Sequence, residues 1–231
     1  MKTLISIFLF FFVLVTNSMA QNATEIVKKA DEKMQGLSNY TVITIKIIRP
    51  TWEREMKMRA WSKGNEYSLI IIDEPAKDKG TVFLKRQKEI WNWLPSIDKS
   101  MKLPPSMMMQ NWMGTDFTND DLVKQSSVVN DYTHKLIGDS VIQNYDCYKI
   151  EMLPKEEAAV VWGKVILFVD KKEYMEMRVE YFDEDGYLIN LMNFYDIKRM
   201  DGRLIPSRME MIPADSPEKK TVMIYNSIEF D

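Results

Sequence analysis

The chain has very little of the chemistry that most enzymes use. Of its 231 residues only Cys147 is cysteine and only His134 is histidine. A lone cysteine can form no internal disulfide, so we expect Cys147 to be a small buried residue on a strand. A single histidine excludes a multi-histidine metal site, and no G-x-S-x-G motif of a hydrolase accompanies it. We expect His134 to be an ordinary polar residue on a strand face.

Phosphate-binding and calcium-binding loops are missing as well. The sequence contains neither G-x-x-x-x-G-K-[ST] nor G-x-G-x-x-G. The run Asp183–Gly186 has its glycine in the wrong place for a calcium loop and predicts a turn. The net charge of −3 argues against a nucleic-acid ligand. We therefore predict no catalytic residues, no cofactor, no metal site and no nucleic-acid partner, although carboxylates could still converge from separate strands as in glycosidases.

The first 20 residues have the pattern of a secretory signal. Lys2 precedes an apolar run from Leu4 to Val15, and small residues up to Ala20 suit a signal peptidase. Spanning a bilayer takes about 20 apolar residues, so an uncleaved anchor is the less favoured alternative. We expect cleavage between Ala20 and Gln21. A lipoprotein would need a cysteine directly after the cleavage site, and Gln21 stands there instead. Because secreted eukaryotic proteins more often carry paired cysteines, the expected compartment is the bacterial periplasm.

Residues 21–231 show no linker or change in composition and are expected to form one domain. An amphipathic helix is expected over Ala23–Gln35, ended by Gly36. Strands with period-two alternation then follow in series. The expected strands are 40–49, 52–62, 66–73, 81–85, 89–94, 99–103, 133–138, 146–153, 160–169, 175–182, 188–199, 204–212 and 221–230. Short turns such as Asp185-Gly186 require neighbouring strands to run antiparallel.

Two short helices are expected between the two series of strands. Pro104-Pro105 interrupts the strand pattern, and Ser106 can cap a helix that continues through Met113. Thr118–Asp121 resembles a capping box, which opens a second helix to about Gln125. The sequence therefore predicts a mainly β, α+β fold in which a large curved antiparallel sheet carries an N-terminal helix and short central helices.

Methionine is unusually abundant, with 18 residues, and several surround this central segment together with tryptophans. A methionine surface adapts to apolar ligands of several shapes. Three adjacent methionines on one short helix cannot all face one core, so at least one should face outward or toward a cavity. Two interpretations stay open: these side chains fill a core, or they line an apolar cavity under a sheet that does not close. The candidate ligand-binding residues are Met56, Met58, Trp91, Trp93, Met107, Met108, Met109, Trp112, Met113 and Phe117.

Several motifs follow one another along residues 21–231. Trp91–Pro95 comes first, then Lys102-Leu103, and then the run Trp112–Leu122. Cys147–Glu151 and Asp201–Pro206 follow downstream. Together they resemble the outer-membrane lipoprotein-sorting protein family, in the LolA/LolB-like superfamily, and more closely its uncharacterised LolA-like branch than the proven lipoprotein carrier.

This resemblance implies an unclosed β-barrel whose apolar cavity takes acyl chains without a cofactor. It also implies a carrier that receives lipoproteins or other lipids from an inner-membrane transporter and passes them to an outer-membrane acceptor. We expect it to act as a monomer. In the family's carrier an early-strand arginine holds a lid closed; Arg54 and Arg59 lie on such a strand, and Arg59 is the candidate. The alternatives are a periplasmic sensor that binds acylated ligands and signals to a membrane protein, and a hydrolase with carboxylates in the cavity.

Overall fold

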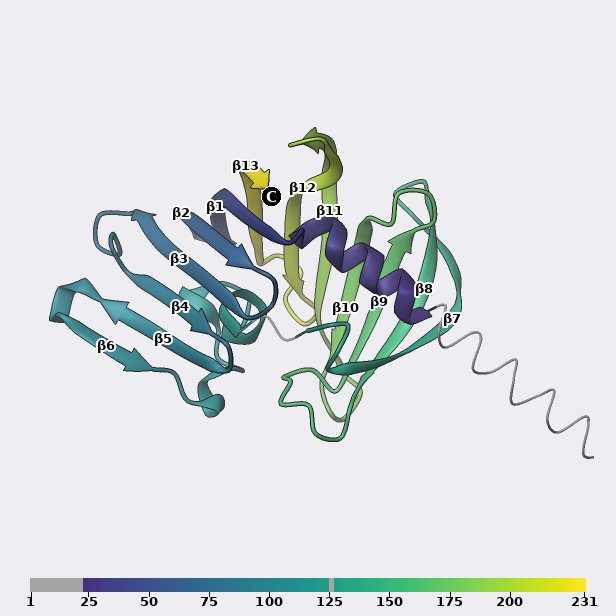
Figure 1. The fold of residues 1–231 in the computed structure, drawn as a ribbon, viewed down its shortest axis with the longest axis horizontal. Coiled ribbons are helices and arrows are strands. Elements are labelled where there is room, and N and C mark those ends of the chain that lie inside the picture. Colours follow the sequence, from purple (N-terminus) through teal and green to yellow (C-terminus); the bar gives the residue numbers. More distant parts are fainter. Residues whose placement is uncertain (1–22, 125–126) are drawn as a thin grey trace, which may run out of the picture.

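The computed structural model describes residues 23–124 and 127–231. Within them thirteen strands form one antiparallel sheet, in the order β6-β5-β4-β3-β2-β1-β13-β12-β11-β10-β9-β8-β7 (Figure 1). The edge strands β6 and β7 do not pair with each other, so the predicted unclosed sheet is confirmed. The expected signal, residues 1–20, lies outside the described residues. No helix in the part of the chain that the structure describes is long and apolar enough to cross a membrane.

All thirteen strands lie where the alternation predicted them, with ends shifted by a few residues. They are β1 (Ser38–Arg49), β2 (Trp52–Lys63), β3 (Tyr67–Glu74), β4 (Val82–Arg86), β5 (Glu89–Leu94), β6 (Lys99–Lys102), β7 (Tyr132–Ile142), β8 (Tyr145–Pro154), β9 (Lys164–Asp170), β10 (Glu176–Phe182), β11 (Leu188–Met200), β12 (Arg203–Pro213) and β13 (Lys220–Phe230).

The sheet consists of two leaves that meet in its middle. Strands β1 to β6 form one leaf and β7 to β13 the other, each built from neighbours in sequence (Figure 1). The leaves are joined where β1 pairs with β13, from Asn39 opposite Phe230 to Ile48 opposite Lys220. The register shifts between Val42 and Ile43, and such a bulge increases the local twist of a sheet.

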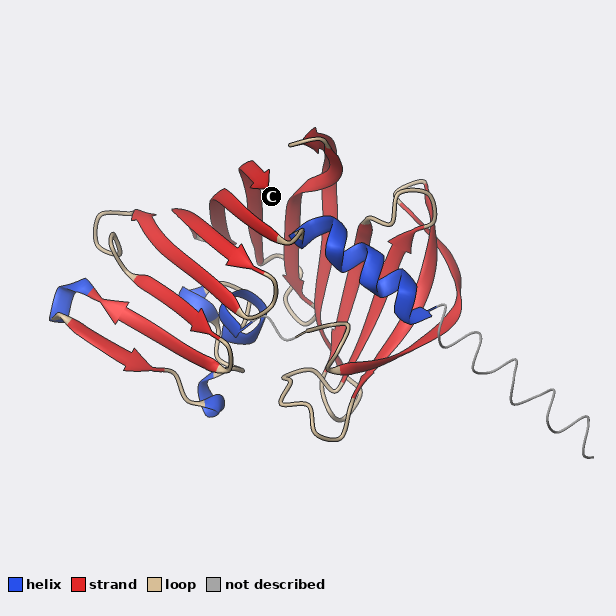
Figure 2. Cartoon of the chain, viewed as in Figure 1, coloured by secondary structure: helices blue, strands red, loops and turns tan. Residues whose placement is uncertain are grey.

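The expected N-terminal helix is present over residues 23–35 and lies across the second leaf (Figure 2). Its buried side faces the sheet through Ala23, Ile26, Val27 and Ala30. Gly36 ends it with a φ of +66°, a left-handed conformation that glycine adopts without strain.

Hydrogen bonds attach both ends of this helix to the second leaf. His134 on β7 donates from Nε2 to the Val128 carbonyl at 2.7 Å, and its Nδ1 lies 3.0 Å from the Thr24 hydroxyl. At the other end Lys33 bonds the Glu173 carboxylate at 2.9 Å. Arg203 donates to the Glu32 carbonyl at 2.9 Å and stacks over Phe230. The helix is thus held firmly, and its last turn is fixed relative to the sheet.

The second leaf buries apolar side chains on both faces. Val165 and Leu167 of β9 belong to the main core beneath the helix, whereas Ile166 and Phe168 join a smaller cluster on the opposite face. Cys147 is fully buried in that smaller cluster, as expected, and burial raises the pKa of its thiol to about 11. It is a packing residue rather than a reactive one.

The central segment, residues 104–124, differs from the expected pair of helices. The predicted helix from Ser106 to Met113 is wrong: two 3₁₀ turns stand there instead, Pro105–Met107 and Trp112–Gly114. Met113 has a φ of +49°, which interrupts helical geometry. The Trp112 amide donates to the Phe117 carbonyl at 2.8 Å, so the chain folds back on itself in a compact loop.

The capping box at Thr118 is confirmed. The Thr118 amide donates to Asp121 Oδ2 at 2.8 Å, and the Asp121 amide donates to the Thr118 hydroxyl at 3.1 Å. The turn that follows is a π-helix over Asp120–Lys124, and Gln125 lies outside the described residues. Such π-helical turns are frequent at functional sites.

Candidate ligand-binding cavity

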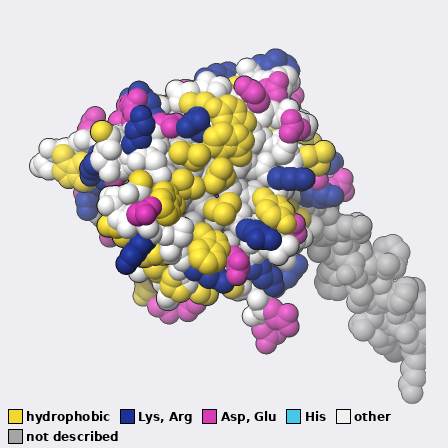
Figure 3. All heavy atoms as spheres, turned by 60° about the vertical axis from the view of Figure 1, so that its left-hand side comes forward, with side chains coloured by type: hydrophobic (Ala, Val, Ile, Leu, Met, Phe, Trp, Pro, Cys, Tyr) yellow, Lys and Arg dark blue, Asp and Glu magenta, His cyan; other side chains and the backbone are white. Residues whose placement is uncertain are grey.

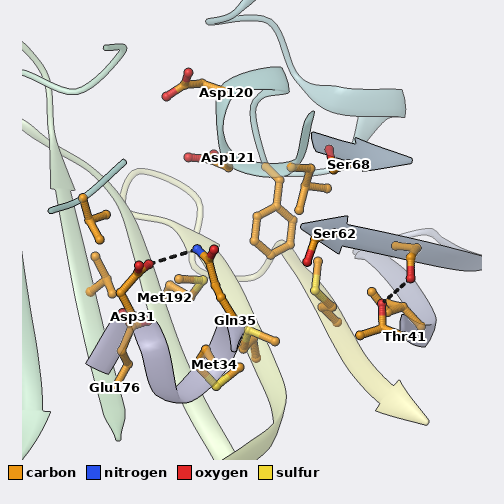
Figure 4. Close-up of a pocket in the computed structure, with 18 of the residues that line it drawn as sticks. Asp31, Met34, Gln35, Thr41, Ser62, Ser68, Asp120, Asp121, Glu176 and Met192 are labelled. Atoms are coloured by element: carbon orange, nitrogen blue, oxygen red, sulfur yellow. Dashed lines mark hydrogen bonds between the residues drawn. The ribbon is translucent and has the colours of Figure 1, made fainter. Parts of the chain in front are cut away.

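A cavity of about 290 Å³ lies between the C-terminal part of the helix, strands β1 to β3, the strands of the second leaf and the central segment (Figure 4). Ligand pockets are roughly 300–1,000 Å³, so this one suits a single slender ligand. Most of the residues that line it are hydrophobic, and they come from ten strands, β1 to β3 and β7 to β13. Representative wall residues are Ile43, Met58, Ile70, Met152, Met209 and Met223.

Two of the ten predicted ligand-binding residues, Met58 and Phe117, line this cavity. Met56 and Trp112 instead lie fully buried in the core around it. Trp112 packs against Phe83 with ring centroids 5.4 Å apart. The core interpretation therefore applies to Met56 and Trp112, and the cavity interpretation to Met58 and Phe117.

Trp91 and Trp93 lie on the outer face of β5, away from the cavity. Ile90 and Asn92 of the same strand are buried inward, so the alternation of side chains turns the two tryptophans outward. Trp91 lies opposite the exposed Leu84 on β4. Figure 3, which brings the first leaf forward, shows hydrophobic side chains interspersed with lysine and arginine on this surface.

The side chains of the three adjacent methionines, Met107–Met109, point in different directions, as expected for neighbouring residues. Met108 is buried in the core, Met107 is half-buried against it and Met109 is 68% exposed. Met109 lines a separate hollow of about 390 Å³. Met113 is half-buried against the core and does not line the cavity.

Four carboxyl groups also line the cavity, and sequence reasoning identified none of them. They are Asp31 on the helix, Asp120 and Asp121 on the central segment, and Glu176 on β10. Among the described residues that line the cavity there is no lysine, arginine or histidine. In Figure 4 Asp31 and Glu176 lie beside each other at one end of the cavity, with Asp120 and Asp121 at another. The cavity therefore combines apolar walls with an acidic interior.

A β-bulge turns Glu176 into the cavity. On β10, Val179 and Tyr181 face inward, so regular alternation would direct Met177 inward and Glu176 outward. The register between β10 and β9 shifts between Glu176 and Arg178, and Met177 instead joins the cluster on the opposite face. Bulges re-aim side chains in this way and are common next to binding sites.

The carboxyl groups in the cavity differ in their hydrogen-bond partners. Asp31 accepts a bond from the Gln35 amide at 2.9 Å, and Asp121 accepts one from Trp162 Nε1 at 3.1 Å. Among the described residues no hydrogen bond or ion pair is formed by the Glu176 carboxyl. Burial, with a smaller contribution from neighbouring Asp31, raises the pKa of Glu176 to about 7. Burial likewise raises the pKa values of Asp31 and Asp121 to about 6.

These carboxyls do not form a metal site. Within residues 23–124 and 127–231, no group of three or more histidine, cysteine or acidic side chains is arranged to hold a metal ion. They are distributed over the helix, the central segment and β10.

A buried ion pair attaches the central segment to the junction of the two leaves. Arg49 at the end of β1 donates to both carboxylate oxygens of Asp116, at 3.0 and 2.9 Å. Thr221 on β13 donates its hydroxyl to the same carboxylate at 2.7 Å, and Asn190 on β11 donates to the Asp116 carbonyl. Arg54 donates to the neighbouring Met113 carbonyl. Asp116 is thus bonded to three strands.

Arg59, the candidate for holding a lid, does not contact the central segment. It forms a two-bond pair with Asp73 on the adjacent strand, at 2.8 and 2.9 Å, and lies over Trp61. Sequence reasoning missed Arg49 because it lies at the end of the first strand rather than on the second. The only signal available was Asp116, which falls within the Trp112–Leu122 motif.

Comparisons with known proteins agree with this architecture. A family model described as "-like: Uncharacterized protein" matches residues 64–231, whereas no curated protein sequence matches the chain. A solved DUF1329 family protein from Desulfovibrio piger is 21% identical with a TM-score of 0.82, and covers 92% of this chain and 93% of its own. A candidate outer-membrane lipoprotein-sorting domain from Vibrio parahaemolyticus is 20% identical with a TM-score of 0.81 and the same coverage. A LolA superfamily protein from Nitrosomonas europaea is 24% identical with a TM-score of 0.78, covering 90% of this chain and 93% of its own. At these identities the likeness is one of fold.

Proposed function

We propose that this chain, which belongs to the uncharacterised LolA-like branch of the outer-membrane lipoprotein-sorting protein family, is a periplasmic carrier that binds the acyl chain of a lipid or lipoprotein. The observation that carries the proposal is the largely apolar cavity beneath an open sheet. Methionine side chains supply much of its wall, and they adapt to a flexible hydrocarbon without a fixed shape.

The size of the cavity favours one chain at a time. Each buried methylene contributes about 0.8 kcal/mol, so ten of them contribute about 8 kcal/mol before the entropy cost of association. A membrane donor and an outer-membrane acceptor would supply and remove the cargo by competing for the chain.

The central segment is the part of the wall that would move to admit a larger cargo. It contributes Phe117, Asp120, Asp121 and Leu122 to the cavity. In this proposal the bonds from Arg49 to Asp116 and from Arg54 to the Met113 carbonyl keep the segment closed, the role for which Arg59 was the sequence candidate.

Lipid extraction and native mass spectrometry of the purified protein test the proposal, followed by titration with a neutral fluorescent acyl probe. Met192→Trp should abolish binding, because this half-buried cavity residue would fill the space with an indole ring. Met101→Trp is the matched control, since Met101 is exposed on the edge strand β6. The proposal is wrong if no acyl ligand binds the unaltered protein, or if both variants bind it equally.

A further inference from the structure

Acyl-chain binding does not explain the acidic side chains of the cavity. A hydrocarbon offers a carboxylate no partner, and burying an unpaired charge raises the free energy of the folded protein. Glu176 is the clearest case, because its side chain is only partly exposed, lines the cavity and has no hydrogen-bond or ion-pair partner among the described residues. The bulge on β10 is what points it inward.

The cavity has the composition of a site for a cation attached to an apolar body. Four acidic side chains and no basic ones line it, so its interior attracts positive charge and repels fatty-acid carboxylates and phosphates. Tyr181 and Tyr225 line it as well. Aromatic rings attract ammonium groups through their faces, which adds to the effect of the carboxylates.

We propose that the cavity selects amphiphiles whose head group is a protonated amine, with the ammonium between Asp31 and Glu176 and the hydrocarbon against the methionine-lined wall. This inference rests on the proposed function and names the class of cargo. Asp31 and Glu176 come from different elements and lie beside each other in Figure 4, so one ammonium group can donate to both. The wall beyond them is formed by Met58, Ile70 and Met209.

The proposed ammonium site does not depend on the position of the central segment. Asp31 belongs to the last turn of the fixed helix, and Glu176 begins a central strand of the second leaf. Neither belongs to the central segment, so the amine site persists whether or not that segment moves. Asp121, by contrast, is held by Thr118 and Trp162 and moves with it.

Binding of dodecylamine, dodecanol and dodecanoate to the purified protein at pH 8 tests the inference, with displacement of a neutral fluorescent probe as the readout. Dodecylamine should bind at least about tenfold more tightly than dodecanol, and dodecanoate most weakly; tenfold corresponds to about 1.4 kcal/mol. Glu176→Gln should remove the preference for the amine while leaving dodecanol binding unchanged. Asp31→Asn, on another element, should do the same.

Glu180→Gln is the matched control, because Glu180 lies on the same strand and does not line the cavity. Equal affinity of the unaltered protein for amine and alcohol would overturn the inference while leaving the carrier proposal intact. Failure to bind all three dodecyl compounds would overturn both. Hydrolysis of a dodecyl ester that disappears in Glu176→Gln would also overturn it, since the carboxyl would then be a catalytic acid or base.

Discussion

Replacing Glu176 by glutamine removes one partly buried ionisable group and keeps the shape of its side chain. In the folded protein burial raises the pKa of Glu176 from 4.5 to about 7. Between these values the unfolded chain releases the proton while the folded protein retains it. The free energy of unfolding therefore falls as the pH rises from about 4.5 to 7, and the loss is complete above pH 7.

The magnitude follows from the two pKa values. Their difference is about 2.5, and each pKa unit corresponds to about 1.4 kcal/mol, which gives about 3 kcal/mol. Glutamine resembles the neutral acid and cannot ionise, so the variant does not lose this free energy of unfolding at high pH. Glu176→Gln should therefore be more stable than the unaltered protein by about 3 kcal/mol at pH 8 and equally stable at pH 4. For a chain of this size that raises Tm by about 6 to 12 °C at pH 8.

Urea unfolding followed by tryptophan fluorescence at pH 4, 6 and 8 measures the effect. Glu180→Gln is again the control, since the same substitution on the same strand but outside the cavity should give no comparable gain at pH 8. A gain of equal size at pH 4 and pH 8 would refute the reasoning, because it would come from packing rather than from ionisation. No gain at pH 8 would show that the carboxylate is already compensated in the folded protein.

Three further changes test other features of the structure. Asp116→Ala leaves Arg49 buried without its partner and should lower the free energy of unfolding by about 3 to 5 kcal/mol in urea; a loss below 1 kcal/mol would show that the pair is not structural. Gly163→Ala places a Cβ atom 2.5 Å from the Asp183 carbonyl oxygen, so the backbone must shift. The free energy of unfolding should fall by about 1 to 3 kcal/mol, which is measured as a lower Tm. Cys147 should resist alkylation at pH 8 until the protein unfolds, because its pKa is about 11 and it is fully buried; rapid labelling of the folded protein would contradict this.

The strands could be predicted from the sequence because their signals are local. Alternating side chains and short turns mark each strand, and the helix over residues 23–35 has its own apolar stripe and glycine stop. The central segment could not be predicted in the same way. Its shape depends on the bond between Trp112 and Phe117 and on the left-handed Met113, neither of which leaves a periodic pattern.

The candidate site was only partly accessible to sequence reasoning. The alternation on β5 places Trp91 and Trp93 on one face, but it does not show which face is buried, and in the structure Ile90 and Asn92 are the buried pair. Glu176 was different, because strict alternation places it outward and only the bulge brings it inward. Its signal in the sequence was weak: one charged residue between two methionines.

The pairing of β1 with β13 has a consequence for folding. Each leaf is a chain of hairpins between sequence neighbours, and such local contacts form early. The pairing of Asn39 with Phe230 joins residues from opposite ends of the described chain and is expected to form last. Because the cavity draws its walls from both leaves, it comes into existence only with that final step. We therefore expect that a newly made chain binds ligand only after β1 has paired with β13. Ligand binding would then indicate that folding is complete.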